Sequence, residues 1–178
     1  MMKNNNITEI VNQNTLDSYS TTEKTNMQNG RVTFVQNDND IINFVNKAKN
    51  AVTSNKMFFG KIGQEISNKI KNILGLDVSN YNVALSSYEI KHILNNHSDK
   101  KKEISRGQVP ITVDDFKKIP QIISNPDSIY QDGTTFQGKA IIIFKKNIAG
   151  NNVIVSWVSD KHKNLDIHTM RKFKNNKK

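Results

Sequence analysis

Two apolar segments near the C-terminus constrain the fold more than any other part of this chain. Lys139–Lys145 (KAIIIFK) is apolar between its lysines, which is typical of a strand buried on both faces. Asn152–Ser159 (NVIVSWVS) follows after a short link in which Gly150 supplies the turn, so the two segments predict an antiparallel hairpin. Shorter strands are predicted at Asp127–Tyr130 and Leu165–Thr169, the latter being the weakest, with the start of a C-terminal helix as its alternative. The sequence therefore predicts a small antiparallel sheet of about four strands.

Helical patterns precede these strands. Apolar residues recur at helical spacing over Ile41–Val52, with Asp38 or Asp40 as the predicted cap, and again over Gln64–Leu74. A third helix is predicted from Ser86 to His97, where a Ser and a Glu three residues later form a capping pattern. Helices first and paired strands last predict an α+β fold.

The chain divides by composition into four segments. Residues 1–30 are rich in Asn, Thr and Ser and are expected to be disordered or a linker. Residues 31–55 are expected to form an N-terminal strand and helix extension, residues 56–174 the main domain, and residues 175–178 a basic tail. No apolar run approaches about 18 residues, and the N-terminus lacks the apolar segment of a signal peptide, so neither a membrane span nor a signal peptide is predicted.

Positive charge is concentrated in the second half of the chain. The protein carries a net charge of +10, and residues 81–178 hold 17 Lys and Arg against 9 Asp and Glu, together with all four histidines. This asymmetry favours a polyanionic partner, most simply nucleic acid, although a charged tail contributes to it. With one Trp in the chain, a base-stacking platform of the single-strand-binding type is not expected.

Several kinds of site are excluded by the residues present. The absence of cysteine excludes disulfides, thiolate nucleophiles and Cys-type zinc sites. Neither a Gly-rich phosphate loop nor a nucleophile elbow occurs. His92 and His97 are five residues apart, so their rings diverge by about 140° around a helix, which argues against a zinc pair. The sequence predicts neither a metal nor another cofactor.

The polar candidates each allow two interpretations. His97 ends the apolar face of its helix and acts either as a general acid or base or as a cap for the last carbonyls. Glu103 and Arg106 form either an exposed ion pair or a group in which Arg106 is aimed at a phosphate. For His92 a solvated role is favoured, and for Ser156 a buried hydroxyl bonded to the backbone. Such groups suit RNA cleavage, in which the 2′-OH attacks the adjacent phosphate without a cofactor.

From about Phe58 to Phe173 the chain resembles the phage-associated branch of the barnase–EndoU–colicin–RelE-like (BECR) nucleases. This domain occurs at the C-terminus of phage MuF-type minor head proteins and in related toxins. The matching pieces are FFGKIG, HILNNH, EISRGQVPITVDDFKKIPQIISNP, the two strands and the closing IHTMRKF. One departure is Arg171, which stands where an aromatic residue is expected.

The resemblance implies N-terminal helices packed on one face of a twisted antiparallel sheet, and a metal-independent endoribonuclease with tRNA as one candidate substrate. The catalytic candidates by position are His97, Glu103, Arg106, Thr169, His92 and Ser156. The candidates for nucleic-acid contact are Lys139, Lys145, Lys146 and Arg171.

The resemblance also implies a biological setting. Members serve as toxins or phage effectors, so we expect an immunity or inhibitor protein as a partner, and a location in the cytoplasm or delivery into that of a target cell. The alternative is a non-catalytic phage head-associated or regulatory module that binds nucleic acid or a protein. An ADP-ribosyl transferase is a third hypothesis, for which the chain shows no nicotinamide-binding pattern. The oligomeric state is not predicted.

Overall fold

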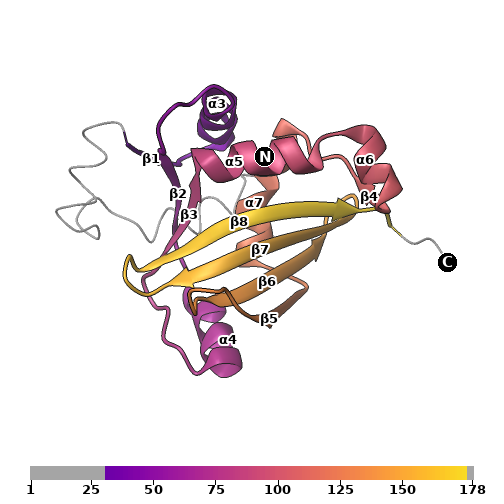
Figure 1. Ribbon diagram of the computed structural model, residues 1–178. Helices are drawn as coiled ribbons and strands as arrows, with labels where there is room; N and C mark the ends of the chain where they lie inside the picture. The colour runs from indigo at the N-terminus through magenta and orange to yellow at the C-terminus, as the bar shows by residue number, and fades with distance from the viewer. Residues whose placement is uncertain (1–30, 176–178) are drawn as a thin grey trace, which may run out of the picture.

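The computed structural model describes residues 31–175, which form a mixed sheet with helices around it (Figure 1). The predicted linker of residues 1–30 and the last three residues of the predicted tail lie outside the described residues. In chain order the elements are β1 (Val32–Phe34), α3 (Asp38–Ala48), β2 (Lys56–Lys61), α4 (Gln64–Leu74), β3 (Asn82–Ser86), α5 (Ser87–His97), α6 (Lys100–Ser105), β4 (Gln108–Val109), the 3₁₀ helix η2 (Val113–Lys118), α7 (Ile119–Ser124), β5 (Ser128–Thr134), β6 (Ala140–Asn147), β7 (Asn151–Ser159) and β8 (Asn164–Phe173).

The sheet is larger than the sequence predicts. It has eight strands in the order β1-β2-β3-β8-β7-β6-β5, with β4 added on β8, so the expectation of about four strands is wrong. It is also mixed, because β1 pairs parallel to β2 and β3 pairs parallel to β8. Both β2 and β3 are short apolar runs whose residues do not alternate in polarity, and such runs are ambiguous from sequence. Their partners are distant in the chain, so only the tertiary structure identifies them.

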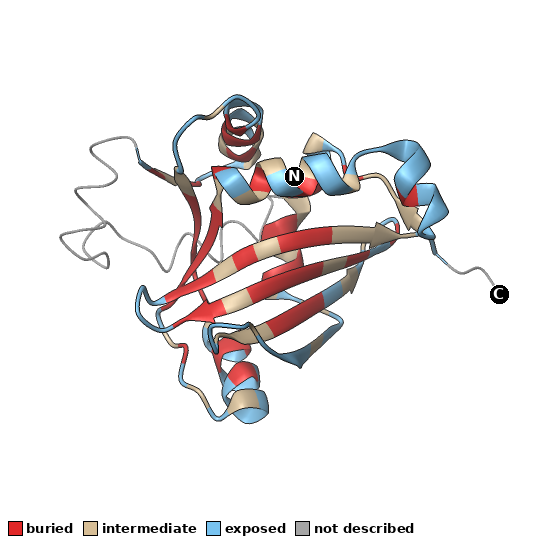
Figure 2. Ribbon diagram, in the orientation of Figure 1, coloured by how far each residue is buried: buried red, intermediate tan, exposed pale blue. Residues whose placement is uncertain are grey.

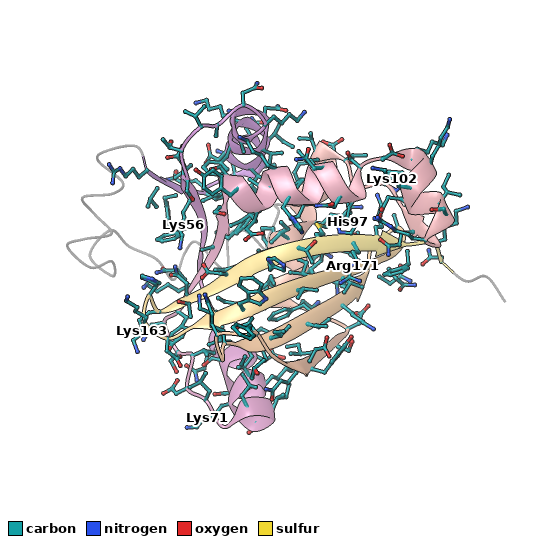
Figure 3. The ribbon with its side chains drawn as sticks, viewed as in Figure 1. Lys56, Lys71, His97, Lys102, Lys163 and Arg171 are labelled. Carbon is teal, nitrogen blue, oxygen red and sulfur yellow. The ribbon has the colours of Figure 1, made fainter. Side chains whose placement is uncertain are left out.

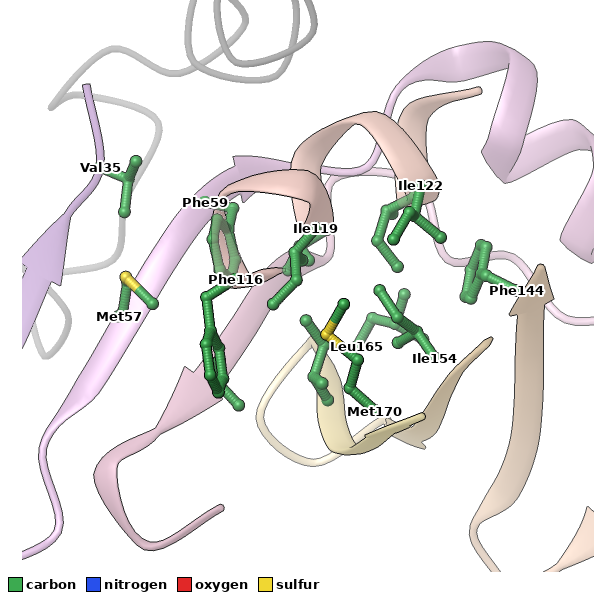
Figure 4. Close-up of a cluster of buried hydrophobic side chains, with 14 of the residues drawn as sticks. Val35, Met57, Phe59, Phe116, Ile119, Ile122, Phe144, Ile154, Leu165 and Met170 are labelled. Carbon is green, nitrogen blue, oxygen red and sulfur yellow. The ribbon is translucent and has the colours of Figure 1, made fainter. Parts of the chain in front are cut away.

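The helices that cover the sheet are not all N-terminal. η2 and α7 follow α5 in the chain, and α7 contacts β6 and β7 from behind the sheet in Figure 1. Their buried side chains Phe116, Ile119 and Ile122 join the same core as residues of β2, β7 and β8 (Figure 4). The expected packing of N-terminal helices on one face is therefore not confirmed in that simple form.

The segment of residues 31–55 contributes to this common core. α3 begins three residues before the predicted helix because Asn37 is its cap and accepts from the amide of Asp40. Its buried face includes Ile41 and Phe44, which pack with the rest of the core. The boundary expected near residue 56 stays a prediction. Figure 2 shows the buried residues of α3 facing the molecule and its exposed residues facing outward.

β8 is the central strand of the fold, although it is the weakest strand in the sequence. It pairs along its whole length with β7, and its ends pair with β3 and β4. Between these two end pairings, α5 packs along β8 (Figure 1). The carbonyl of His97 accepts from the amide of Ile111 at 2.6 Å, which fixes the end of α5. The fold thus holds a helix end against one edge of a central strand.

Polar and apolar residues interleave along β8, and this explains why the strand is hard to predict. Leu165, Ile167 and Met170 are buried in the core. A register shift between Val155 and Ser156 of β7 changes the simple alternation at the middle of β8.

None of the helices in residues 31–175 has the length and apolar character needed to cross a membrane.

Candidate active site

Glu103 is the centre of a buried polar cluster. The short helix α6 is capped by Asp99, whose side chain accepts from the amide of Lys102, and the helix turns Glu103 inward to 0 % exposure. Glu103 Oε2 lies 3.2 Å from His97 Nδ1, and Glu103 Oε1 accepts from Arg106 Nη1 at 2.9 Å. The pair of Glu103 and Arg106 therefore forms as expected from a helical spacing, but its carboxylate end is wholly buried.

Arg106 is hydrogen-bonded both to Glu103 and to the end of α5. Its Nη1 also donates to the carbonyl of Asn96 at 2.9 Å, so it ties α6 to the end of α5. The side chain is 47 % exposed, which leaves part of the guanidinium at the surface. The structure thus brings His97, Glu103 and Arg106 together, as the enzyme hypothesis requires.

The environment of His97 sets its charge state. Burial lowers the pKa of His97, hydrogen bonding and charge attraction to Glu103 raise it, and Arg171 and Arg106 lower it further. The net effect places the pKa below the ordinary 6.5, so the imidazole is neutral near pH 7. Because the carboxylate accepts the hydrogen bond, the proton lies on Nδ1 and the lone pair lies on Nε2. Neutral His97 can therefore accept a proton from a substrate.

β8 brings two further candidates to this site. Thr169 lies opposite Val155 and Arg171 lies opposite Val153, so both side chains belong to the same sheet face. Thr169 Oγ1 and Arg171 Nε are buried polar atoms without a hydrogen-bond partner in residues 31–175. Figure 3 shows His97 at the end of α5 and Arg171 close to it on β8.

A second His–Glu pair, His168 and Glu89, also lies between β8 and α5. His168 of β8 stacks on Trp157 of β7, with ring centroids 4.0 Å apart and planes 19° apart. His168 Nδ1 is 3.2 Å from Glu89 Oε2, although this contact lacks hydrogen-bond geometry. His92 is exposed, as expected, but its ring also stacks with His168 at 5.4 Å.

Glu89 has a different role from the one its spacing suggests. Ser86 Oγ accepts from the Glu89 amide at 3.2 Å, which is the expected cap, but the Glu89 carboxylate faces His168. The sequence pattern did not indicate Trp157 or Glu89 as site residues, and it left His168 ambiguous between a solvated position and a phosphate contact. For His168, the available signal in the sequence was the set of polar residues that interleave with the apolar residues of β8.

Comparison with known proteins identifies the family of this chain. A family model described as phage-Barnase-EndoU-ColicinE5/D-RelE like nuclease3 matches residues 60–178, which is more than half of the chain. The chain belongs to this nuclease family. Neither a curated protein nor a solved structure shows significant similarity to it. The resemblance to the phage-associated BECR nucleases is therefore confirmed, and all the clustered polar residues lie inside the matched range.

Other candidates of this BECR-family nuclease lie apart from His97. Ser156 is fully buried and its Oγ donates to the carbonyl of Ile142 at 2.8 Å, so the structure places it in the core and not in the cluster. The favoured interpretation, a buried hydroxyl bonded to the backbone, is the correct one. Lys146 lies 3.5 Å from Asp127 on another part of the surface.

Two of the predicted nucleic-acid contacts extend the basic surface of the site. Lys145 and Arg171 both lie opposite Val153 on neighbouring strands, so they share a sheet face. Lys139 lines a cavity together with Trp157 and His168. Within residues 31–175, no group of three or more His, Asp or Glu side chains is arranged to hold a metal ion.

Proposed function

We propose that this nuclease is a metal-independent endoribonuclease with His97 as the general base. The observation that carries the proposal is the hydrogen-bonded contact between His97 Nδ1 and the buried carboxylate of Glu103, with Arg171 near enough to lower the pKa of His97. An imidazole and a guanidinium directed at one phosphodiester are the groups that 2′-OH attack requires.

The reaction proceeds in one in-line displacement. His97 Nε2 takes the proton of the ribose 2′-OH, whose oxygen attacks the adjacent phosphorus. Arg171, with the hydroxyl of Thr169, balances the charge that develops on the phosphate oxygens. The bond from phosphorus to the 5′-oxygen then breaks and leaves a 2′,3′-cyclic phosphate. Glu103 does not touch the substrate and is a positioning residue, since both carboxylate oxygens are already bonded to protein.

His168 is the group best placed to protonate the leaving 5′-oxygen. It lines one cavity together with Arg171, and it is in contact with the carboxylate of Glu89. Its side chain is 29 % exposed, so a substrate can reach it. His97 and His168 then act as base and acid on two sides of the phosphate bound at Arg171.

The test uses the purified full chain with total RNA and with tRNA, in the presence of EDTA. We expect internal cleavage and 2′,3′-cyclic phosphate ends. A synthetic oligonucleotide with a single 2′-deoxy substitution at the mapped site must resist cleavage, because it lacks the nucleophile. Folded protein that binds RNA and leaves it intact would instead support a non-catalytic binding module, which is the alternative. tRNA specificity, a toxin or phage-effector role, an immunity protein and a cytoplasmic site of action stay predictions.

A further inference from the structure

A cavity of about 530 Å³ lies on the sheet face that carries Arg171. The strand residues that line the cavity are Ile141, Ile143, Val155, Trp157, His168 and Arg171. Ile141 lies opposite Trp157 and Ile143 lies opposite Val155, so the floor of the cavity is an apolar surface on β6 and β7. Its volume is within the range of small-ligand sites, about 300–1,000 Å³.

Two aromatic side chains flank this floor. Trp157 is the only tryptophan of the chain, and its indole lines the cavity beside the ring of His168. Phe136, in the loop between β5 and β6, lines the cavity and is fully exposed at 108 %. A fully exposed Phe next to a half-buried Trp is an arrangement that a planar apolar ligand would cover.

The cavity shares Arg171 and His168 with the proposed site of cleavage. Arg171 lines it and also acts on the charge state of His97, so the same guanidinium belongs to both. A phosphate bound at Arg171 therefore holds its attached nucleoside next to the apolar floor. Asp132 and Gln137 line the cavity as well and supply polar groups for the edge of a ring. A planar ring, polar at its edge and joined to a phosphate, is a nucleobase.

We propose that this cavity binds one nucleobase of the RNA, held between Trp157 and Phe136, beside the phosphate at which cleavage occurs. This inference rests on the proposed function and adds a binding site to it. It differs from the stacking platform that the small number of aromatic residues argued against, because a single base needs only these two side chains. The base then orients the adjoining ribose, and hence the 2′-OH, toward His97.

The single tryptophan makes a direct test possible. The probe is a 2′-O-methyl dinucleoside monophosphate, which carries a phosphate and bases but cannot be cleaved by 2′-OH attack. Titration into the wild-type chain should change the fluorescence of Trp157, because a ring stacked on the indole alters its emission. The matched probe is the same dinucleotide without bases, at equal ionic strength. It should cause no comparable change.

The variant Phe136→Ala should weaken binding of the base-containing probe by about 5- to 150-fold, the range measured for loss of one stacking contact. Ile73→Ala, which removes a partly exposed apolar side chain from α4, is the control and should leave the affinity unchanged. Circular dichroism checks that both variants fold.

The outcomes separate this inference from the proposed function. Equal fluorescence changes with and without bases, no change with either probe, or an unaffected Phe136→Ala variant would each overturn the base site. If the same preparation still cleaved RNA, the proposed nuclease function would stand without the base site. A base-dependent change in protein that cleaves no RNA would support the cavity as a base site and contradict the catalytic proposal.

Discussion

The two His–Glu pairs beside α5 differ in burial and in geometry. In the first pair, Glu103 is fully buried, His97 is 13 % exposed, and the two are hydrogen-bonded. In the second pair, Glu89 and His168 are 28 % and 29 % exposed, and their contact lacks hydrogen-bond geometry. A desolvated, hydrogen-bonded pair fixes the orientation and tautomer of its imidazole, whereas a partly exposed pair without a hydrogen bond leaves its imidazole accessible to a substrate. For this reason we propose His97 as the general base and His168 as the general acid of the cleavage reaction.

The largest effect is expected from removing the imidazole of the buried pair. His97→Ala should lower kcat by about 10²–10⁴-fold, the usual contribution of a general base. The measurement is initial-rate cleavage of the mapped RNA substrate in EDTA. His162→Ala, in the exposed turn between β7 and β8, is the matched control and should retain the wild-type rate. Equal rates for the two variants would remove His97 from the mechanism.

A smaller effect, which depends on the leaving group, is expected for the exposed pair. His168→Ala should slow RNA cleavage by about 10²-fold, since it removes the acid that protonates the 5′-oxygen. With a nucleoside 3′-(4-nitrophenyl phosphate), whose leaving group needs no proton, His168→Ala should be nearly as active as wild type. His97→Ala should be inactive on both substrates. If both variants lose activity equally on the activated substrate, the division into base and acid is wrong.

The two carboxylates should differ in their contribution to stability. Glu103→Gln replaces one of the two buried acceptor oxygens by a donor, so one of the hydrogen bonds from His97 and Arg106 is lost and the free energy of unfolding should fall by about 1–3 kcal/mol. Glu89→Gln breaks a partly exposed pair and should cost less than about 1 kcal/mol. Urea denaturation of the two variants and wild type measures both values. A similar loss for both would show that burial does not distinguish the pairs.

The smallest expected effect is a shift in the pH dependence. Because the pKa of His97 is lowered in the folded protein, the fall of kcat/KM on acidification should lie below pH 6.5. The folded state binds fewer protons at His97 than the unfolded state does, so this group's contribution to stability is present above pH 6.5 and is lost as pH falls through the folded pKa. Arg171→Gln removes a nearby positive charge and should move the acid limb toward 6.5. Lys145→Gln, on the same sheet face, should leave the limb in place.

Local patterns accounted for much of the fold. The bounds predicted for Gln64–Leu74 agree with α4, and Gly75 ends that helix at a positive φ of 70°, because glycine adopts this conformation without strain. The hairpin of β6 and β7 also forms where expected. Helical periodicity and turn residues act over a few positions, so a single sequence is enough to detect them.

The sequence by itself determined the three longer helices α3, α4 and α5, the central hairpin, the family and the spacing that joins Glu103 to Arg106, but not the short helices α6 and α7. Only the tertiary structure decided that the sheet has eight strands and that β8 is central, because these depend on pairings between residues far apart in the chain. The tertiary structure also buries Glu103, for which the sequence allowed an exposed ion pair. It brings Glu89, Trp157 and His168 together from three elements. Charge, burial and stacking are properties of neighbours in space, so they appear only when the chain has folded.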